Sequence, residues 1–239
     1  MAVISKTPTD AVFNVLAAEY YDPILHPTCA NFRAASIQIV SRWLEDHQAS
    51  ICDVGCGESV VADILSKTNS SLSNLFLTDS SSAMLEHSRK WERFGAALSV
   101  GAANKLPFRD SSFNRVVASL ADPFNDPDFW SEAKRVLAPN GLVIFTTPSH
   151  EWALTFRRNE PQGVVDKAEF VLRNGQRVWI PSIIHSEQAQ TQMINEAGLS
   201  VAKVERVTLQ DLSGQAISTK LKVLGNPSSP VVTGYIVKP

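Results

Sequence analysis

Short apolar runs that alternate with amphipathic stretches constrain the fold of this chain more than any other feature. Five runs are rich in branched apolar residues: ASICDV (49–54), SNLFLTD (73–79), ALSVG (97–101), NRVVASL (114–120) and NGLVIFTTP (140–148). Stretches with helical spacing of apolar residues separate them: SVVADILSKT (59–68), SAMLEHSRKWERF (82–94) and PDFWSEAKRVLAP (127–139). Strands that alternate with helices indicate βαβ units, and near-continuous apolar strands indicate a parallel sheet buried on both faces. The sequence therefore predicts a doubly wound α/β fold.

Length, charge and cysteine content limit the class of protein. A chain of 239 residues fits one α/β domain with insertions. It has 22 basic and 24 acidic residues, a net charge of −2, and no run of five like charges. A general polyanion binder would normally carry a basic stripe, so nothing global indicates nucleic acid. Three cysteines, no apolar leader and no run long enough to cross a membrane predict a cytoplasmic protein.

A glycine-rich turn, DVGCGES (53–59), follows the first predicted strand. Gly55 and Gly57 let backbone N–H groups approach a ligand closely at this position of an α/β sheet. The spacing differs from the G-x-G-x-x-G of dinucleotide-binding proteins. It resembles the first motif of class I S-adenosylmethionine-dependent methyltransferases, (D/E)-x-G-x-G-x-G, with Ser59 in place of the third glycine.

Three downstream segments extend this resemblance in the same order and spacing. LFLTDSSSAML (75–85) is similar to the D-x-S-x-x-M-L pattern of that family, and GAANKLPFRDSSF (101–113) is similar to its middle motifs. FWSEAKRVLAPNGLVIF (129–145) resembles the segment that enters the fifth strand. The resemblance covers roughly residues 20–148. It implies a Rossmann-like seven-stranded sheet with one reversed strand, and S-adenosyl-L-methionine as cofactor.

The resemblance also implies which residues meet the cofactor. Asp79 ends the second strand, where a carboxylate can accept two hydrogen bonds from a ribose diol. Met84 would flank the adenine, and Tyr21, in an A-x-x-Y-D stretch, would fold over the cofactor. The expected cofactor-binding set is Tyr21, Asp53, Gly55, Cys56, Gly57, Asp79, Ser80, Met84, Ala103, Asn104 and Ser119.

Three positions differ from the family pattern or leave alternatives open. Ser59 could narrow the approach to the methionine moiety. Glu58 could bind the α-amino group of the cofactor or cap the helix dipole, and capping is the preferred interpretation. Ala102 stands where the family usually has Asp, so adenine would depend on the backbone near Ala103 and on Asn104. Cys52 and Cys56 are four residues apart, but no matching His or second Cys pair lies nearby, and no metal site is expected.

Three residues are candidates for catalysis. Asp122 follows the fourth strand in an Asp-Pro-Phe sequence that is similar to the (D/N/S)-P-P-(Y/F) signature of amino-group methyltransferases, although one proline is missing. It could equally begin a turn into the next helix. His26, before Pro27, is a base or a loop residue, and His150, beside Trp152, is a second candidate for proton handling.

The expected organisation has four parts: a helical cap (1–48), a cofactor-binding core (49–148), a substrate lid (149–184) and a segment that completes the sheet (185–239). Asn174-Gly175 between two alternating runs predicts a hairpin in the lid. The arginines and aromatic residues of the lid suit a planar anionic substrate, or else an ordinary amphipathic cover. The connection 209–230 adds a helix or a surface for a partner.

Three functions follow from these observations. The favoured one is methyl transfer, by in-line displacement, to a small planar or carboxylated metabolite. The second is RNA-base methylation, which only the arginines and aromatic residues of the lid support. The third is a catalytically silent protein that binds S-adenosylmethionine, suggested by Ser59 and Ala102. The sequence leaves the oligomeric state open.

Overall fold

A seven-stranded sheet forms the centre of the protein in the computed structural model, which describes residues 9–44, 49–68, 71–159 and 166–239. The strand order is β3-β2-β1-β4-β5-β9-β8, and β9 runs antiparallel to both of its neighbours. The strands are β1 (Ile51–Val54), β2 (Leu75–Asp79), β3 (Ala97–Val100), β4 (Phe113–Ala118), β5 (Leu137–Pro148), β8 (Ser200–Thr208) and β9 (Pro230–Lys238). This sheet confirms the predicted doubly wound α/β fold with one reversed strand.

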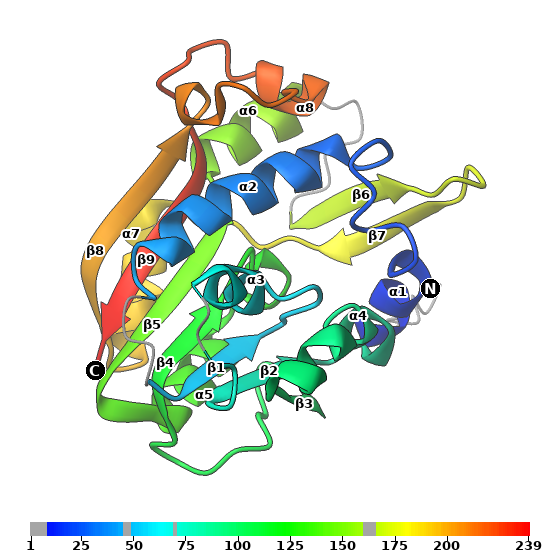
Figure 1. Cartoon of the computed structure of the whole chain (residues 1–239). Coiled ribbons are helices and arrows are strands. Elements are labelled where there is room, and N and C mark those ends of the chain that lie inside the picture. The colour runs from blue at the N-terminus through cyan, green and yellow to red at the C-terminus, as the bar shows by residue number, and fades with distance from the viewer. Residues whose placement is uncertain (1–8, 45–48, 69–70, 160–165) are drawn as a thin grey trace, which may run out of the picture.

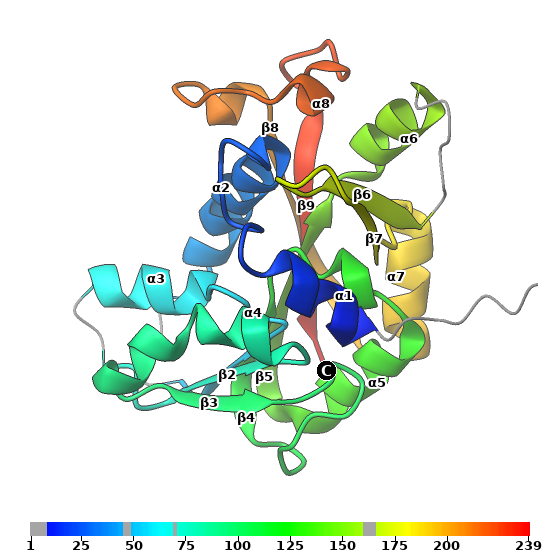
Figure 2. The same cartoon turned by 90° about the vertical axis from the view of Figure 1, so that its right-hand side faces the viewer.

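Helices cover both faces of the sheet. Figures 1 and 2 show α2, α3 and α4 on one face and α5 and α7 on the other. The α-helices are α1 (Thr9–Leu16), α2 (Pro27–Ser41), α3 (Val60–Lys67), α4 (Ser82–Glu86), α5 (Pro127–Val136), α6 (His150–Asn159), α7 (Glu187–Glu196) and α8 (Thr219–Lys222). Three short 3-10 helices are η1 (Arg89–Phe94), η2 (Asp122–Phe124) and η3 (Gln210–Leu212).

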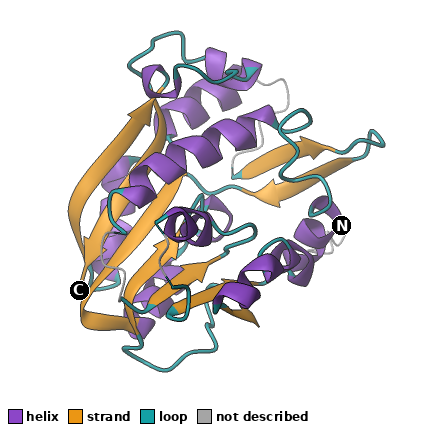
Figure 3. Cartoon of the chain, in the orientation of Figure 1, coloured by secondary structure: helices purple, strands orange, loops and turns teal. Residues whose placement is uncertain are grey.

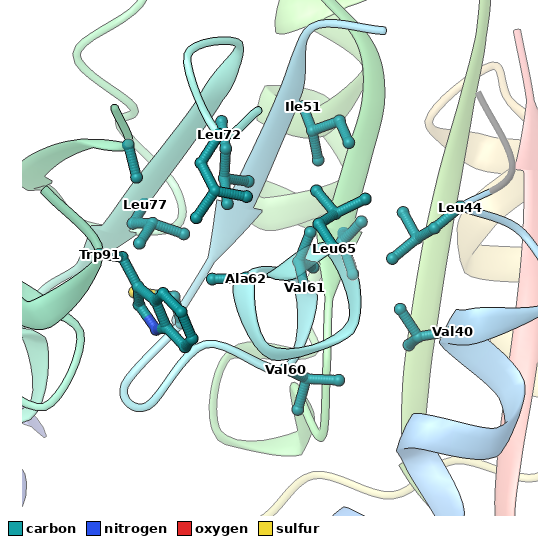
Figure 4. Close-up of a cluster of buried hydrophobic side chains, with 14 of the residues drawn as sticks. Val40, Leu44, Ile51, Val60, Val61, Ala62, Leu65, Leu72, Leu77 and Trp91 are labelled. Atoms are coloured by element: carbon teal, nitrogen blue, oxygen red, sulfur yellow. The ribbon is translucent and has the colours of Figure 1, made fainter. Parts of the chain in front are cut away.

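Two hydrophobic cores lie on opposite faces because neighbouring strand residues point in opposite directions. Ile51 and Val117 pack toward α3 in one core, of which Figure 4 shows a close-up. Val116 and Phe145 pack toward Trp130 of α5 in the other. Burial on both faces explains why these strands read as continuous apolar runs in the sequence.

The stretch 82–94, predicted as one helix, is instead α4 followed by η1. The break lies at Ser88, whose hydroxyl donates to the carbonyl of Gly57 at 2.6 Å and accepts from the N–H of Ser59 at 2.9 Å. Ser88 thus satisfies backbone groups of the glycine-rich turn, and the chain leaves the regular helix there.

A separate two-stranded hairpin, β6 (Lys167–Val171) and β7 (Arg177–Pro181), stands apart from the main sheet (Figure 3). Gly175 at its tip has a φ of +82°, a left-handed conformation that favours glycine. The hairpin predicted around Asn174-Gly175 is therefore present. β7 contacts α1 and η2, so the hairpin lies near the carboxyl end of β4. Within the described ranges no helix is long and apolar enough to cross a membrane.

Candidate active site

A cavity of about 740 Å³, here called the large cavity, opens at the carboxyl ends of β1, β2 and β4. Most of the residues expected at the cofactor lie in its wall: Tyr21, Gly55, Cys56, Asp79, Ser80, Met84, Ala103, Asn104 and Ser119. Asp53 and Gly57, also expected there, do not line the cavity. The fold thus brings together side chains from α1 to the end of β4.

The Asp79 carboxylate is held in a fixed orientation at the wall of the large cavity. One of its oxygens accepts from the N–H of Gly57 at 2.9 Å, and the other accepts from the N–H of Ser81 at 2.9 Å. Burial raises the pKa of Asp79, and these backbone donors counteract the rise. Each carboxylate oxygen has a further lone pair. A diol in the cavity would find two pre-oriented acceptors.

The two glycines of the turn make room for aromatic side chains. Gly57 has a φ of +45°, and a Cβ added there would lie 2.0 Å from the Tyr21 hydroxyl oxygen. Gly55 has a φ of +63°, and its Cβ would lie 2.5 Å from the Phe124 ring. Tyr21 and Phe124 both line the large cavity. The glycines therefore shape the cavity partly by admitting these two rings.

Ser59 does not narrow the cavity, contrary to the expectation from the sequence, because it is fully buried behind the turn. Its hydroxyl caps α3 by accepting from the N–H of Ala62 at 2.9 Å and donates to Asp53 at 2.6 Å. Burial raises the pKa of Asp53 to about 7. Asp53 and Ser59 thus stabilise the glycine-rich turn through buried hydrogen bonds.

Arg33 is a wall residue that sequence reasoning missed. Its guanidinium donates to the carbonyl of Glu58 at 2.6 Å and lies over the Tyr21 ring, 5.4 Å from the centroid. The Glu58 carboxylate lies 3.6 Å from Arg33 and 2.8 Å from Lys90. Glu58 is therefore an ion-pair partner, while Ser59 caps α3. The available signal was that Arg33 is the only charged residue in α2.

Helix α1 and the turn after it cover the large cavity. The Tyr21 hydroxyl accepts from the N–H of Glu58 at 2.7 Å, which joins this cover to the glycine-rich turn. Ser81 donates to the side chain of Asn14 at 2.6 Å, and the His87 ring hydrogen-bonds the carbonyl of Ala17 at 2.9 Å. Three contacts thus hold the segment 9–22 over the site.

A second, smaller cavity of about 290 Å³ adjoins the first. The two share four wall residues: Tyr20, Cys29, Leu120 and Pro123. The short helix η2 separates them, because Asp122 lines the small cavity, Pro123 lines both and Phe124 lines the large one. Molecules bound in the two cavities would thus contact each other at this partition.

Two of the three catalytic candidates lie in the small cavity. Burial raises the pKa of Asp122 to about 6, while Ser182 and the Arg157 guanidinium counteract the rise. His26 is buried, with its ring 5.1 Å from that of Phe170, and burial lowers its pKa. Its Nε2 atom has no hydrogen-bond partner within the described part of the chain. His150 lines neither cavity.

The backbone at Leu120, in the shared wall, adopts a left-handed conformation with a φ of +54°. Such a conformation costs a branched residue about 1–3 kcal/mol and persists only where surrounding contacts impose it. The N–H of Leu120 donates to the Thr146 hydroxyl at 2.9 Å, and the N–H of Ala121 donates to the Thr146 carbonyl at 2.9 Å. Nothing in the sequence marked this position.

The arginines of the predicted lid are engaged in contacts with protein groups. Arg173 lies 3.0 Å from Asp22, and Arg177 lies 2.7 Å from Glu169. Arg157 donates to the carbonyl of Ser182 at 2.8 Å and to its hydroxyl at 2.9 Å. These contacts explain why the lid offers less free positive charge than its composition indicates. The side chain of Arg158 lies outside the described residues.

The sequence is similar to a known protein family and to curated proteins. The model of a family described as "Methyltransferase domain" matches residues 52–145. An uncharacterized 37.1 kDa protein in transposon TN4556 of Streptomyces fradiae is 28% identical over 200 residues, which cover 78% of this chain and 54% of that protein. A Danio rerio protein named mitochondrial arginine-hydroxylase NDUFAF5 is 38% identical over 94 residues, which cover 38% of this chain and 28% of that protein. The chain thus spans about half or less of these curated relatives.

A solved structure extends the likeness to nearly the whole fold. A Thermotoga maritima protein described as an S-adenosylmethionine-dependent methyltransferase, possible histamine N-methyltransferase, superimposes with a TM-score of 0.66 at 17% identity. The match covers 96% of this chain and 99% of that one. At this identity the likeness establishes the fold, and the family match adds a methyltransferase domain at residues 52–145. Residues 52–145 therefore match a methyltransferase domain, and the chain has the fold of the class I S-adenosylmethionine-dependent methyltransferases.

Proposed function

We propose that the protein transfers a methyl group from S-adenosylmethionine to a small molecule held in the small cavity. The observation that carries this proposal is the partition at η2, where two cavities of different character share one wall. Methyl transfer by in-line displacement needs the acceptor atom and the methyl carbon on one line, in contact. Two adjoining cavities would allow that arrangement.

The large cavity suits the cofactor by size and by the chemistry of its wall. Its volume lies in the range of pockets that enclose ligands of this size. Asp79 would bind the ribose hydroxyls, and the Arg33 guanidinium would bind the methionine carboxylate. Met84 and the backbone at Ala103 would border the adenine. When bound there, S-adenosylmethionine supplies an electrophilic methyl group on its sulfonium.

The small cavity is lined by groups that could accept the proton that the methyl acceptor loses. A hydroxyl or amine nucleophile must lose a proton during transfer. The Asp122 carboxylate, with its pKa raised to about 6, is largely ionised at neutral pH and could accept that proton. His26, with its pKa lowered by burial, is a neutral acceptor in the wall of the same cavity. His150 is left out of this proposal because it lies in neither wall.

A small acceptor is favoured over RNA by the geometry of the small cavity. The hairpin and α1 cover the cavities, and the lid arginines that would meet a phosphate backbone already have acidic or carbonyl partners. A net charge of −2 adds no attraction for a polyanion. Both features argue for a substrate that enters a pocket.

The test is transfer of labelled methyl from S-adenosylmethionine to a cell extract separated into small-molecule and RNA fractions. We expect label in the small-molecule fraction, and activity that rises with pH through about 6 as Asp122 ionises. Asp122→Asn should lower turnover by about 100-fold and remove that limb, with unchanged binding of S-adenosylhomocysteine. Label confined to RNA would contradict the proposal, and cofactor binding without any transfer would favour the silent-binder alternative.

A second candidate, favoured by the likeness to the Danio rerio protein, is hydroxylation of an arginine side chain, with dioxygen as the oxidant and a two-electron reductant as co-substrate. That likeness covers 38% of this chain and 28% of the named hydroxylase. Mass spectrometry of the product separates the two, because an added methyl group and an added oxygen atom differ in mass.

A further inference from the structure

The two carboxylates in the wall of the small cavity already have cationic neighbours. Asp122 is influenced by the Arg157 guanidinium, and Glu169 pairs with Arg177 at 2.7 Å. The net charge of the cavity wall therefore depends on its remaining cations, Lys167 and Lys220. Lys167 is exposed at the start of β6, whereas Lys220 is half-buried.

The ammonium group of Lys220 lies close to other wall residues of the small cavity. Its Nζ lies 5.1 Å from the centroid of Phe156, another wall residue. Its positive charge lowers the pKa of His26 and that of Cys29, which both line this cavity. No carboxylate of the residues that the structure describes lies within ion-pair distance of this ammonium.

The position of Lys220 is fixed by the fold of the connection 209–230. Its carbonyl accepts from the indole N–H of Trp152 at 2.9 Å, and the next residue, Leu221, is fully buried. Ser218 caps α8, and its backbone N–H donates to the side chain of Asn31 at 3.0 Å. The backbone that carries the ammonium is thus anchored to α2 and α6.

Flat aromatic surfaces line the same cavity as this cation. The rings of Trp152 and Phe156 stack with centroids 5.2 Å apart and an interplanar angle of 5°. Tyr20 and Phe170 stack with centroids 5.6 Å apart and an angle of 24°. All four line the small cavity. Such walls favour a planar ring, which stacks or packs edge-on against them.

We propose that the methyl acceptor is an aromatic carboxylic acid, and that Lys220 is its carboxylate anchor. This inference rests on the proposed function, because it takes the small cavity as the acceptor site. The ring lies between the aromatic walls with its carboxylate on the Lys220 ammonium. The nucleophilic substituent then lies at the shared wall, beside Asp122. The connection 209–230 thereby contributes specificity to a site otherwise built from the core and the hairpin.

The experiment measures binding to the protein saturated with S-adenosylhomocysteine, so that it needs no turnover. The probes are 4-hydroxybenzoate, 4-hydroxybenzamide and 4-hydroxybenzylamine, which match in shape and differ in charge. Wild-type protein should bind the benzoate about tenfold more tightly than the benzamide, and the benzylamine most weakly. Lys220→Met should remove this preference, and Lys220→Arg should retain it. Lys222→Met is the matched control, because Lys222 is exposed in the same helix and lines neither cavity.

Three results would overturn the inference: benzoate affinity unchanged in Lys220→Met, tighter binding of the benzamide or the benzylamine, or binding of none of the probes. Retained affinity for S-adenosylhomocysteine in Lys220→Met shows that the variant is folded, and Lys220→Gln provides a second charge-removing variant. Failure of the proposed function is recognised separately. In that case wild-type protein does not bind S-adenosylhomocysteine, or it transfers no methyl group.

Discussion

Single side chains at the glycine-rich turn link the sequence motif to the cavity. Tyr21 reaches the turn from a distant part of the chain, and its hydroxyl occupies the space that a Cβ at Gly57 would need. The turn therefore makes contacts on two sides: the N–H of Gly57 donates to Asp79, and the Tyr21 side chain packs against the turn. The need for glycine at position 57 therefore depends on Tyr21, which only the folded chain brings to the turn.

Gly57→Ala should weaken binding of S-adenosylhomocysteine by about 2 kcal/mol, because the new Cβ displaces Tyr21 and strains a left-handed backbone. In a Tyr21→Phe background the clash with the hydroxyl is absent, so the added loss should be smaller by about 1 kcal/mol. Calorimetry of the four proteins measures this coupling. Gly225→Ala is the control, because Gly225 has a φ of +68° and open space around it. Equal losses in both backgrounds would show that strain alone makes Gly57 necessary.

Among the elements, α1 and the hairpin form one cover built from two distant segments. Leu16 packs with Phe170, Leu172 and Ile180 in a cluster separate from both cores. The backbone N–H of Arg173 also donates to Glu19 at 2.8 Å. Replacing the hairpin by a short link would therefore disturb the cofactor side as well as the acceptor side, because Tyr20 and Tyr21 follow α1 directly.

Phe170→Ala should loosen this cover by about 3 kcal/mol, since it removes a buried ring that contacts Tyr20 and His26. Hydrogen exchange in residues 9–22 should become faster, and the affinity for S-adenosylhomocysteine should fall. Leu154→Ala is the control, because Leu154 is an exposed apolar residue that lines neither cavity. Exchange in 9–22 that stays as slow as in wild type would mean that α1 holds its place without the hairpin.

At the scale of the whole molecule, the large cavity joins segments that are far apart in the chain. Residues of α1, α2, the glycine-rich turn and the ends of β2 and β4 all contribute to its wall. A ligand there binds only the folded arrangement, so binding and global stability are coupled.

S-Adenosylhomocysteine at 100 times its dissociation constant should raise the free energy of unfolding by about 2.7 kcal/mol. Hydrogen exchange should slow together in residues 9–22, 55–60 and 101–104, because the cavity wall includes all three segments. Asp79→Ala should abolish both effects while the folded sheet remains, as circular dichroism can verify. Protection restricted to 55–60 and 101–104 would show that the cover does not close over the ligand.

Local chemistry determined what the sequence alone revealed. Alternating apolar patterns, two glycines after a strand, an Asp at a strand end and an Asn-Gly turn depend on neighbouring residues, and they predicted the sheet, the turn and the hairpin. Contacts between distant residues decided the rest. Arg33 meets Glu58, Tyr20 meets Phe170, and Trp152 fixes Lys220, only after the chain has folded. The left-handed backbone at Leu120 is likewise imposed by Thr146 on the next strand. A cavity wall is assembled from such non-local contacts, so its charge and shape follow from the tertiary structure.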